Sequence, residues 1–360
     1  YMKMTSKRGV ISAFSRNEPD RVPINYSANP GIDRRLKEHF GLAPDDAEGL
    51  MQRLGVDFRR VSAAYRGPKL HRDIPEKGIK ADIWGIHRRW MEHDTGGYWD
   101  YCDFPLKEAA EEEAAEWPMP NPDDYDYSMV RQGCGKQGQY AVFTGGQGIG
   151  DIINKNGMLR GTEQSLIDLI TDNPAGRILS ERRTDIDVEV LTRTIEAADG
   201  GIDFLYMGED LGSQEGPLIS RDLYLKNIRP FHRKIIDMAK SFDLPVMMHS
   251  CGSSSWAFSD FIELGVDVVD TLQPEAKDMS PAYLKSEFGD RLAFHGCIST
   301  AGPVATGSPE DVREYCRNTL DIMMPGGGYC FAPTHQLQDN SPAENVVAMY
   351  ETAREYGVYT

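Results

Sequence analysis

A histidine and a cysteine two positions apart are the residues whose types and spacing point most directly to chemistry. His249 and Cys251 end an apolar run that starts at Pro245, and a Gly-Ser segment follows them. Side chains two apart on an extended strand point to the same face, so an imidazole nitrogen and a thiolate sulfur would converge. Such atoms are donors in tetrahedral zinc sites, and this pair would supply half of one. The simpler interpretation is a core histidine beside a cysteine that packs as a small apolar residue.

Other candidate ligands, acids and bases stand at the ends of neighbouring strand-like runs. From about residue 139 onward the chain alternates apolar runs with amphipathic stretches, which is typical of βα units around a parallel sheet. Each candidate also has a structural interpretation, such as helix capping, an ion pair with Arg221 or packing in the core. These further candidates are Glu209, Asp210, Glu275, His295, Cys330 and His335.

The elements that must position these residues are strands whose number approaches eight. Eight βα units close into a barrel whose active site lies at the carboxyl ends of the strands. We therefore expect a (β/α)8 TIM barrel. An open doubly wound sheet is the alternative, disfavoured because no G-x-G-x-x-G sequence follows the early strands. The predicted strands cover residues 21–26, 58–62, 140–144, 204–208, 246–249, 268–272, 292–296 and 329–333.

Amphipathic stretches between the strands predict the surrounding helices. The sequence Ser341-Pro342-Ala343-Glu344 predicts a helix start with serine as N-cap, proline at the first helical position and glutamate at the third. A similar start is predicted at Ser308. The predicted helices cover residues 152–172, 185–198, 221–242, 254–264, 282–288, 309–323 and 342–356.

No linker, low-complexity tract or charge block divides the 360 residues, so we expect one domain over residues 1–360. The barrel would carry an N-terminal extension and an inserted β-hairpin at about residues 75–110, which is rich in Trp and Tyr around Gly96-Gly97. The hairpin could form a wall or lid at the barrel mouth.

Composition and charge restrict the class of partner. The chain has 56 acidic and 39 basic residues and a net charge of −17, which disfavours nucleic acids and anionic membranes because both require a positive surface. No apolar run approaches the roughly 20 residues of a membrane span. The six cysteines are dispersed, and the amino terminus lacks the apolar core of a secretory signal. We therefore expect thiols or metal ligands and a cytoplasmic location, with a small molecule or another protein on the substrate side.

Over nearly its full length the chain resembles the uroporphyrinogen decarboxylase superfamily, which implies a (β/α)8 barrel. Besides His-x-Cys-Gly, the resemblance rests on the opening Asn-Glu-Pro-Asp-Arg-Val-Pro at residues 17–23 and on Gly-Pro-Leu-Ile-Ser at residues 216–220. The tail also fits, from the glycine run at residues 326–328 through Ala332-Pro333 to Pro-Ala-Glu-Asn-Val at residues 342–346.

Two groups within this superfamily imply different chemistry. The decarboxylases bind a polycarboxylate tetrapyrrole through arginines shortly after the first strand, but here no arginine follows that strand before Arg34. Many carboxylates need cationic partners to offset their desolvation. The corrinoid-dependent methyltransferases bind zinc through His-x-Cys and a later cysteine, which His249, Cys251 and Cys330 match. His335 could instead be the third ligand, and Glu275 a removable fourth.

The resemblance therefore implies a zinc-dependent methyltransferase with a corrinoid protein as its partner. It would move a methyl group between a methoxylated aromatic, methylamine or methanol and the corrinoid protein or a thiol acceptor. Zinc would act as a Lewis acid, and nearby acids and bases would assist the leaving group. A homodimer is left open. The alternatives are a decarboxylase-like lyase and a non-catalytic ligand-binding barrel. The residues expected to assist catalysis are Glu209, Asp210, Glu275, His295 and His335.

Overall fold

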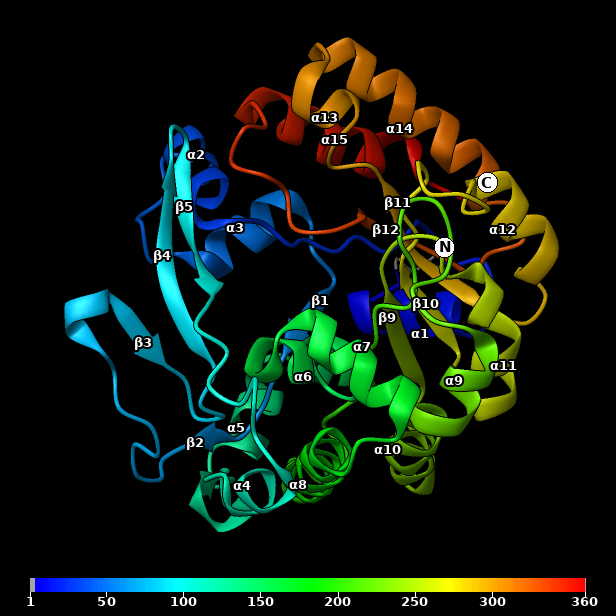
Figure 1. Ribbon diagram of the computed structural model, residues 1–360. Coiled ribbons are helices and arrows are strands. Elements are labelled where there is room, and N and C mark those ends of the chain that lie inside the picture. The colour runs from blue at the N-terminus through cyan, green and yellow to red at the C-terminus, as the bar shows by residue number, and fades with distance from the viewer. Residues whose placement is uncertain (1–3, 360) are drawn as a thin grey trace.

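A parallel sheet forms the centre of the computed structural model, which describes residues 4–359 (Figure 1). Its strands are arranged in chain order, and each pairs in parallel with its neighbours. The register of the sheet places His249 beside Asp270 and Asp270 beside His295, so these three residues share one row. The strands are β1 (Phe58–Arg60), β7 (Ala141–Gly145), β8 (Phe204–Gly208), β9 (Val246–Ser250), β10 (Val268–Thr271), β11 (Ala293–Ile298) and β12 (Tyr329–Pro333).

An extended segment at Ile24 joins the two edge strands. Ile24 forms a parallel bridge with Phe331 of β12, and its carbonyl oxygen accepts a hydrogen bond of 2.8 Å from the backbone N–H of Asp57, directly before β1. The prediction of a full strand at residues 21–26 is wrong, because Pro23 has no N–H to donate and only isolated bridges form. The TIM-barrel-like fold is confirmed, with seven strands and the Ile24 segment in the eighth position.

Helices cover the outside of the sheet, with two breaks that the sequence analysis missed. The stretch predicted over residues 152–172 breaks at Gly161, whose φ of 84° and ψ of 142° are not helical. The stretch over residues 221–242 breaks at Ile228, whose φ of −122° is not helical, and Pro230 lies in the first turn of the next helix, where its missing N–H has no helical partner to lose. The helices after β7 are α6 (Ile152–Arg160), α7 (Thr162–Thr171), α8 (Pro174–Ala198), α9 (Arg221–Asn227), α10 (Arg229–Ser241), α11 (Phe258–Leu264), α12 (Pro281–Phe288), α13 (Pro303–Thr306), α14 (Pro309–Met323) and α15 (Ala343–Tyr356).

The two predicted helix starts differ in outcome. Ser308 caps α14 in a reciprocal capping box with Asp311, as its sequence predicts. Ser341 does not cap α15, which begins at Ala343 after Pro342. Pro342 has an extended ψ of 138° and is itself the N-cap, so the helix starts later than predicted. Within residues 4–359, no helix has the length and apolarity needed to cross a membrane.

Helix α1 (Ser6–Phe14) closes the amino-terminal end of the barrel. Its apolar face, which includes Val10 and Phe14, is buried against residues near the starts of the strands. The rings of Phe14 and Phe204 meet edge to face with their centroids 4.9 Å apart. Because apolar side chains fill this end, polar groups can gather at the carboxyl ends of the strands.

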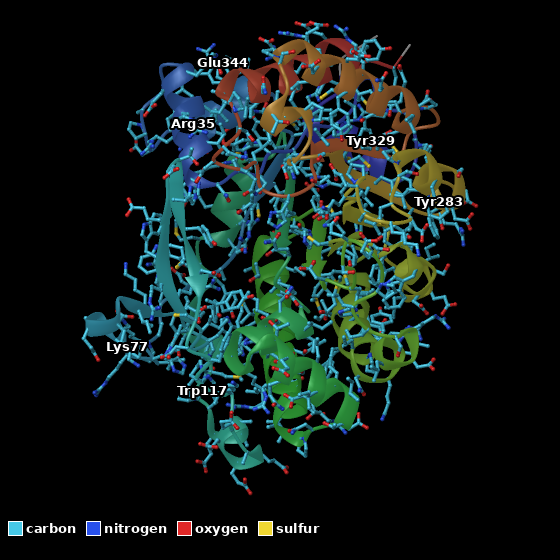
Figure 2. All side chains as sticks on the ribbon, turned by 45° about the horizontal axis from the view of Figure 1, so that its top comes forward. Arg35, Lys77, Trp117, Tyr283, Tyr329 and Glu344 are labelled. Atoms are coloured by element: carbon cyan, nitrogen blue, oxygen red, sulfur yellow. The ribbon has the colours of Figure 1, made fainter. Side chains whose placement is uncertain are left out.

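The segment between β1 and β7 leaves the barrel and forms the predicted hairpin. Figure 2 shows Lys77 and Trp117 of this segment on one side of the molecule and Tyr283 on the other. The hairpin tip reaches the loop after β12, where Nε2 of His93 lies 3.7 Å from a carboxylate oxygen of Asp339. The hairpin therefore touches the loops at the carboxyl ends of the strands. The remaining elements are α2 (Pro30–His39), α3 (Ala47–Leu54), β2 (Ala64–Tyr65), β3 (Ile79–Ala81), β4 (His87–His93), β5 (Gly96–Tyr101), α4 (Glu111–Glu116), β6 (Tyr125–Asp126) and α5 (Val130–Lys136).

Replacing Asp57 should weaken the closure of the barrel. Asp57 is buried, accepts hydrogen bonds of 2.7 and 2.8 Å from Arg21, and also accepts the backbone N–H of Ile24. Asp57→Ala should lower the free energy of unfolding by about 3 kcal/mol, because a guanidinium and a buried N–H lose their acceptor. Urea denaturation followed by circular dichroism measures this change. The exposed Asp45 provides the control, and equal midpoints for Asp57→Ala and Asp45→Ala would contradict this role.

Candidate metal centre

Three side chains with different donor atoms converge at the carboxyl ends of β8 and β9. One donor atom from each of Asp210, His249 and Cys251 lies within 4.8 Å of the other two. The Cys251 sulfur is 3.2 Å from Nε2 of His249, and this nitrogen is 3.6 Å from Oδ1 of Asp210. A carboxylate oxygen, an imidazole nitrogen and a thiolate sulfur are all zinc ligands, so this donor set fits a zinc ion.

Two loops pack backbone against backbone next to these donors. The loop after β8 and the loop after β9 are so close that a Cβ on Gly212 would lie 2.4 Å from the backbone nitrogen of Ser253. The Ser253 N–H donates a 2.7 Å hydrogen bond to the carbonyl oxygen of Ser213. Asp210 is held from both sides, because its Oδ1 accepts from the backbone N–H of Cys251 and its Oδ2 from Nδ2 of Asn154. This packing, which requires glycine, brings the carboxylate to the thiol.

Asp270 orients the imidazole of His249 from below. It lies on β10, and its carboxylate accepts hydrogen bonds from Nδ1 of His249 at 2.7 Å and Nδ1 of His295 at 2.5 Å. The hydroxyl of Tyr206 donates to the same carboxylate. Because Nδ1 of His249 faces Asp270, its Nε2 faces Cys251 and Asp210. A carboxylate behind a ligating histidine is the usual second partner at metal sites, where it fixes the ring and its tautomer.

The charges around His249 favour a cation at this point. Burial alone would raise the pKa of Asp270, but the two histidines outweigh it and lower that pKa well below its usual value. Burial alone would lower the pKa of His249, but Asp270 and Cys251 raise it well above its usual value. Burial also raises the pKa of the Cys251 thiol, against the effect of His249. The negative groups that hold a proton on His249 would equally attract a divalent cation.

His295 and His335 line the same cavity but lie outside the group of three donors. Nε2 of His295 accepts a 3.0 Å hydrogen bond from Nδ2 of Asn25, so this ring is fixed at both nitrogens. His335, in the exposed loop after β12, has its ring centroid 6.3 Å from that of His249. The cavity has a volume of about 300 Å³ and is also lined by Tyr206 and Arg60.

The two glutamates expected to assist catalysis lie elsewhere. Glu209 is fully buried, and its carboxylate accepts hydrogen bonds from the backbone N–H groups of Ile152 and Ile153 at the start of α6. Burial raises the pKa of Glu209 to about 8. Its neighbour Asp210 belongs to the donor group instead. Arg221, considered above as an ion-pair partner, pairs with Asp260. Glu275 is exposed in the loop after β10 and is not part of the donor group.

The structure does not bring Cys330 to the candidate metal centre, which corrects the prediction that it is the third ligand. Cys330 is the second residue of β12 and packs in the apolar layer beneath the site with Val10 and Phe14 of α1. Burial raises the pKa of its thiol well above the usual value, which disfavours the thiolate that binds metal. Asp210, predicted as a catalytic acid, takes the third place in the donor group.

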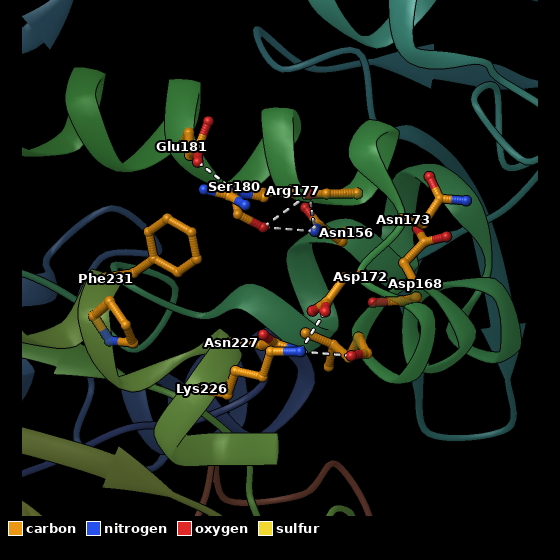
Figure 3. Close-up of a pocket in the computed structure, with 14 residues that line it drawn as sticks. Asn156, Asp168, Asp172, Asn173, Arg177, Ser180, Glu181, Lys226, Asn227 and Phe231 are labelled. Carbon is orange, nitrogen blue, oxygen red and sulfur yellow. Dashed lines mark hydrogen bonds and ion pairs between the residues drawn. The ribbon is translucent and has the colours of Figure 1, made fainter. Parts of the chain in front are cut away.

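A second cavity of about 300 Å³ lies outside the barrel, among helices α6 to α10 (Figure 3). Its polar side chains bind one another, as Figure 3 shows for Nδ2 of Asn156 and the hydroxyl of Ser180, which are 2.9 Å apart. Arg177 similarly binds Glu181 at 2.8 Å. None of the predicted site residues lines this cavity. It is a gap between packed helices, separate from the strand ends.

Asp270 and Tyr206 were missed because both lie inside predicted apolar strands. An acidic residue in the run Val268-Val269-Asp270 was a usable signal, because a charged side chain in a buried strand requires a partner. Arg60, at the end of β1, was also missed. Nothing in their spacing connects these three residues, since the barrel alone brings β1, β8 and β10 to one cavity.

Comparisons with known proteins agree with this architecture. Residues 152–356 match the family of uroporphyrinogen decarboxylase (URO-D), and this match covers more than half of the chain. The chain therefore belongs to the URO-D family. A solved methyltransferase from Methanosarcina mazei has the same fold, with a TM-score of 0.65, 16% identity and coverage of 98% of this chain and 99% of that chain.

Curated relatives carry two different activities in their names. A methylcobamide:CoM methyltransferase, MtbA, from Methanosarcina acetivorans is 27% identical over 161 residues, which is 44% of this chain and 43% of the relative. A uroporphyrinogen decarboxylase from Coxiella burnetii is 21% identical over 180 residues, which is 50% of this chain and 47% of the relative. The matched region thus spans less than half the length of these relatives.

Thiol labelling should distinguish Cys251 from Cys330. Cys251 and Cys102 are partly exposed, whereas Cys330 and Cys316 are buried. In chelator-treated native protein, iodoacetamide should therefore modify Cys251 and Cys102, while Cys330 should react only after unfolding. Peptide mass spectrometry measures the modification, with Cys102 as the control for exposure and Cys316 as the control for burial. Modification of Cys330 at the rate of Cys251 in the native protein would contradict the placement of Cys330.

Proposed function

We propose that this chain is a zinc-dependent methyltransferase that moves a methyl group between a corrinoid carried by a partner protein and a small molecule. The observation that carries the proposal is the convergence of Asp210, His249 and Cys251 at the strand ends, with Asp270 behind the imidazole. The names of the MtbA relatives support a corrinoid substrate and a thiol acceptor. A cytoplasmic location and a homodimer stay predictions.

Each residue of the centre has a distinct part in this proposal. Asp210, His249 and Cys251 would hold the metal. Bound zinc supplies a Lewis acid that keeps a thiol as its thiolate or makes the oxygen or nitrogen of a methyl donor less basic. Asp270 holds His249 with Nε2 toward the metal position. His295, bound by Asp270 and Asn25, and the exposed His335 lie where they can contact a substrate in the cavity.

Metal content should depend on His249 and Cys251 but not on Cys330. We expect about one zinc per chain in the wild-type protein, and its loss in His249→Ala and Cys251→Ala, because each removes a ligand. Cys330→Ala is the matched control and should keep its zinc. Inductively coupled plasma mass spectrometry measures the metal, and circular dichroism checks the fold. A wild-type protein purified without chelators that holds no transition metal would remove the basis of the proposal.

Asp270→Asn should weaken zinc binding without unfolding the chain. The amide keeps the shape of the side chain but loses the charge that stabilises the His249 ring, so we expect 10- to 100-fold weaker zinc affinity. Competition with a chromogenic chelator measures the affinity. The exposed Asp243→Asn variant is the control and should bind zinc like the wild type. An unchanged affinity in Asp270→Asn would show that Asp270 does not support a metal ligand.

Methyl transfer itself can be followed by the absorbance of the corrinoid. We expect zinc-loaded protein to demethylate methylcobalamin in the presence of a thiol, or to methylate cob(I)alamin from a methyl donor, at least 100-fold faster than Cys251→Ala. Cys330→Ala should keep the wild-type rate. If every thiol and donor fails while a porphyrinogen loses carboxyl groups, the lyase alternative replaces this proposal. If neither reaction occurs, a ligand-binding barrel is the better interpretation.

A further inference from the structure

Another cavity, distinct from the one among helices α6 to α10, adjoins the candidate metal centre. It is lined by three cations. It has a volume of about 270 Å³ and shares Arg60, Gly146 and Gln147 with the cavity of the metal centre. Lys155 of α6 and Arg183 of α8 are the other two cations in its lining. The chain as a whole has a net charge of −17, so this concentration of positive charge runs against its composition.

Arg183 is buried and lacks hydrogen-bond partners among residues 4–359. It is only 4% exposed, and within the described residues none of its three guanidinium nitrogens has a partner. Its guanidinium lies over the ring of Trp84, at 5.1 Å from the ring centroid, which is a weak substitute for hydrogen bonds. A buried charge without a partner is costly, and native proteins rarely leave one unsatisfied. An anion in the cavity would satisfy it.

The other two cations approach a glycine-rich loop that also lines the cavity. A Cβ on Gly148 would lie 2.8 Å from Cε and 3.0 Å from Nζ of Lys155, and a Cβ on Gly146 would lie 3.7 Å from Nη2 of Arg60. Glycine at position 148 is therefore needed for the ammonium to lie against the loop. Between residues 4 and 359, no carboxylate oxygen lies within 4.0 Å of a charged nitrogen of these three cations, so none has an ion-pair partner.

The cavity also contains one acidic residue, Asp187. Its carboxyl group is buried on α8, one turn after Arg183, yet it forms no ion pair with Arg183 or Lys155. Burial raises the pKa of Asp187 to about 7, although both cations act against this rise. A protonated carboxyl group can donate a hydrogen bond to an anion. Burial also lowers the pKa of Lys155 and Arg183, against the opposing effect of Asp82, Asp151 and Asp187.

We propose that the cavity formed by Arg60, Lys155 and Arg183 binds the acidic end of the small molecule whose other end reaches the candidate metal centre. That the other end of this molecule reaches the metal centre rests on the proposed function, whereas the anion site itself does not. The substrate would carry a carboxylate or sulfonate, as a methoxylated aromatic acid or a thiol acid does. Methanol and methylamines carry no anionic group and would leave this cavity without a partner.

Paired probes that differ in one charge test this proposal. Isothermal titration calorimetry on the full chain compares 4-methoxybenzoate with 4-methoxybenzamide, and mercaptoacetate with 2-mercaptoethanol, while inorganic sulfate is added as a competitor. We expect each acid to bind at least tenfold tighter than its neutral counterpart. Arg183→Met should abolish this preference, because Arg183 is the buried partner. Arg177→Met is the matched control, since Arg177 lies on the same helix and pairs with Glu181.

Stability distinguishes a binding role of Arg183 from a structural one. Removing an unpartnered buried charge should leave the thermal unfolding midpoint unchanged or higher, even though anion binding is lost. A lower midpoint together with unchanged acid binding would assign Arg183 to the fold and overturn the proposal. If Arg183→Met does not fold, the less buried Lys155→Met variant takes its place and should lose the same preference for acids.

The remaining outcomes separate this proposal from the proposed function. Equal affinity for acids and neutral probes, or equal weakening by Arg177→Met and Arg183→Met, would overturn the anion site. Binding of sulfate without binding of either organic acid would overturn the assignment to an acidic substrate. Acid binding that depends on Arg183 in a protein that holds no zinc would support the anion site, and the proposed function would then fail on its own.

Discussion

The carboxylate of Asp270 is the interaction on which the candidate metal centre depends. It accepts hydrogen bonds from Nδ1 of both His249 and His295, and a third from the hydroxyl of Tyr206. Asp270 is buried, so its negative charge depends on these donors for compensation. The parallel register of β9, β10 and β11 fixes this arrangement, because it places the three strand residues in one row.

The barrel separates an apolar end from a polar end. At the amino-terminal ends of the strands, α1 and a layer of aromatic and aliphatic side chains exclude water. At the carboxyl ends, the loops after β8 and β9 lie backbone against backbone and hold Asp210 beside Cys251. This division explains why two cysteines on neighbouring parts of the same barrel differ in chemistry. Cys251 faces a cavity with polar neighbours, whereas Cys330 packs among hydrocarbon side chains.

Two adjoining cavities at the strand ends differ in their charged groups. One is lined by three imidazoles and the carboxylate of Asp270, the other by Lys155 and Arg183, and Arg60 lines both. A molecule that spanned both would meet a metal-binding group at one end and cations at the other. The URO-D family includes relatives named for methyl transfer and for decarboxylation.

The sequence alone determined much of this protein, because strand periodicity and the His-x-Cys spacing are local properties of the chain. They predicted all seven strands of the central sheet to within about two residues at each end, and they singled out His249 and Cys251. The tertiary structure decided the rest. Asp270 belongs to the site, Cys330 and Glu209 do not, and three cations that are distant in sequence line one cavity. These outcomes depend on strand order, on the end of a strand that a residue occupies and on contacts between remote segments. Spacing along the chain does not determine such long-range contacts.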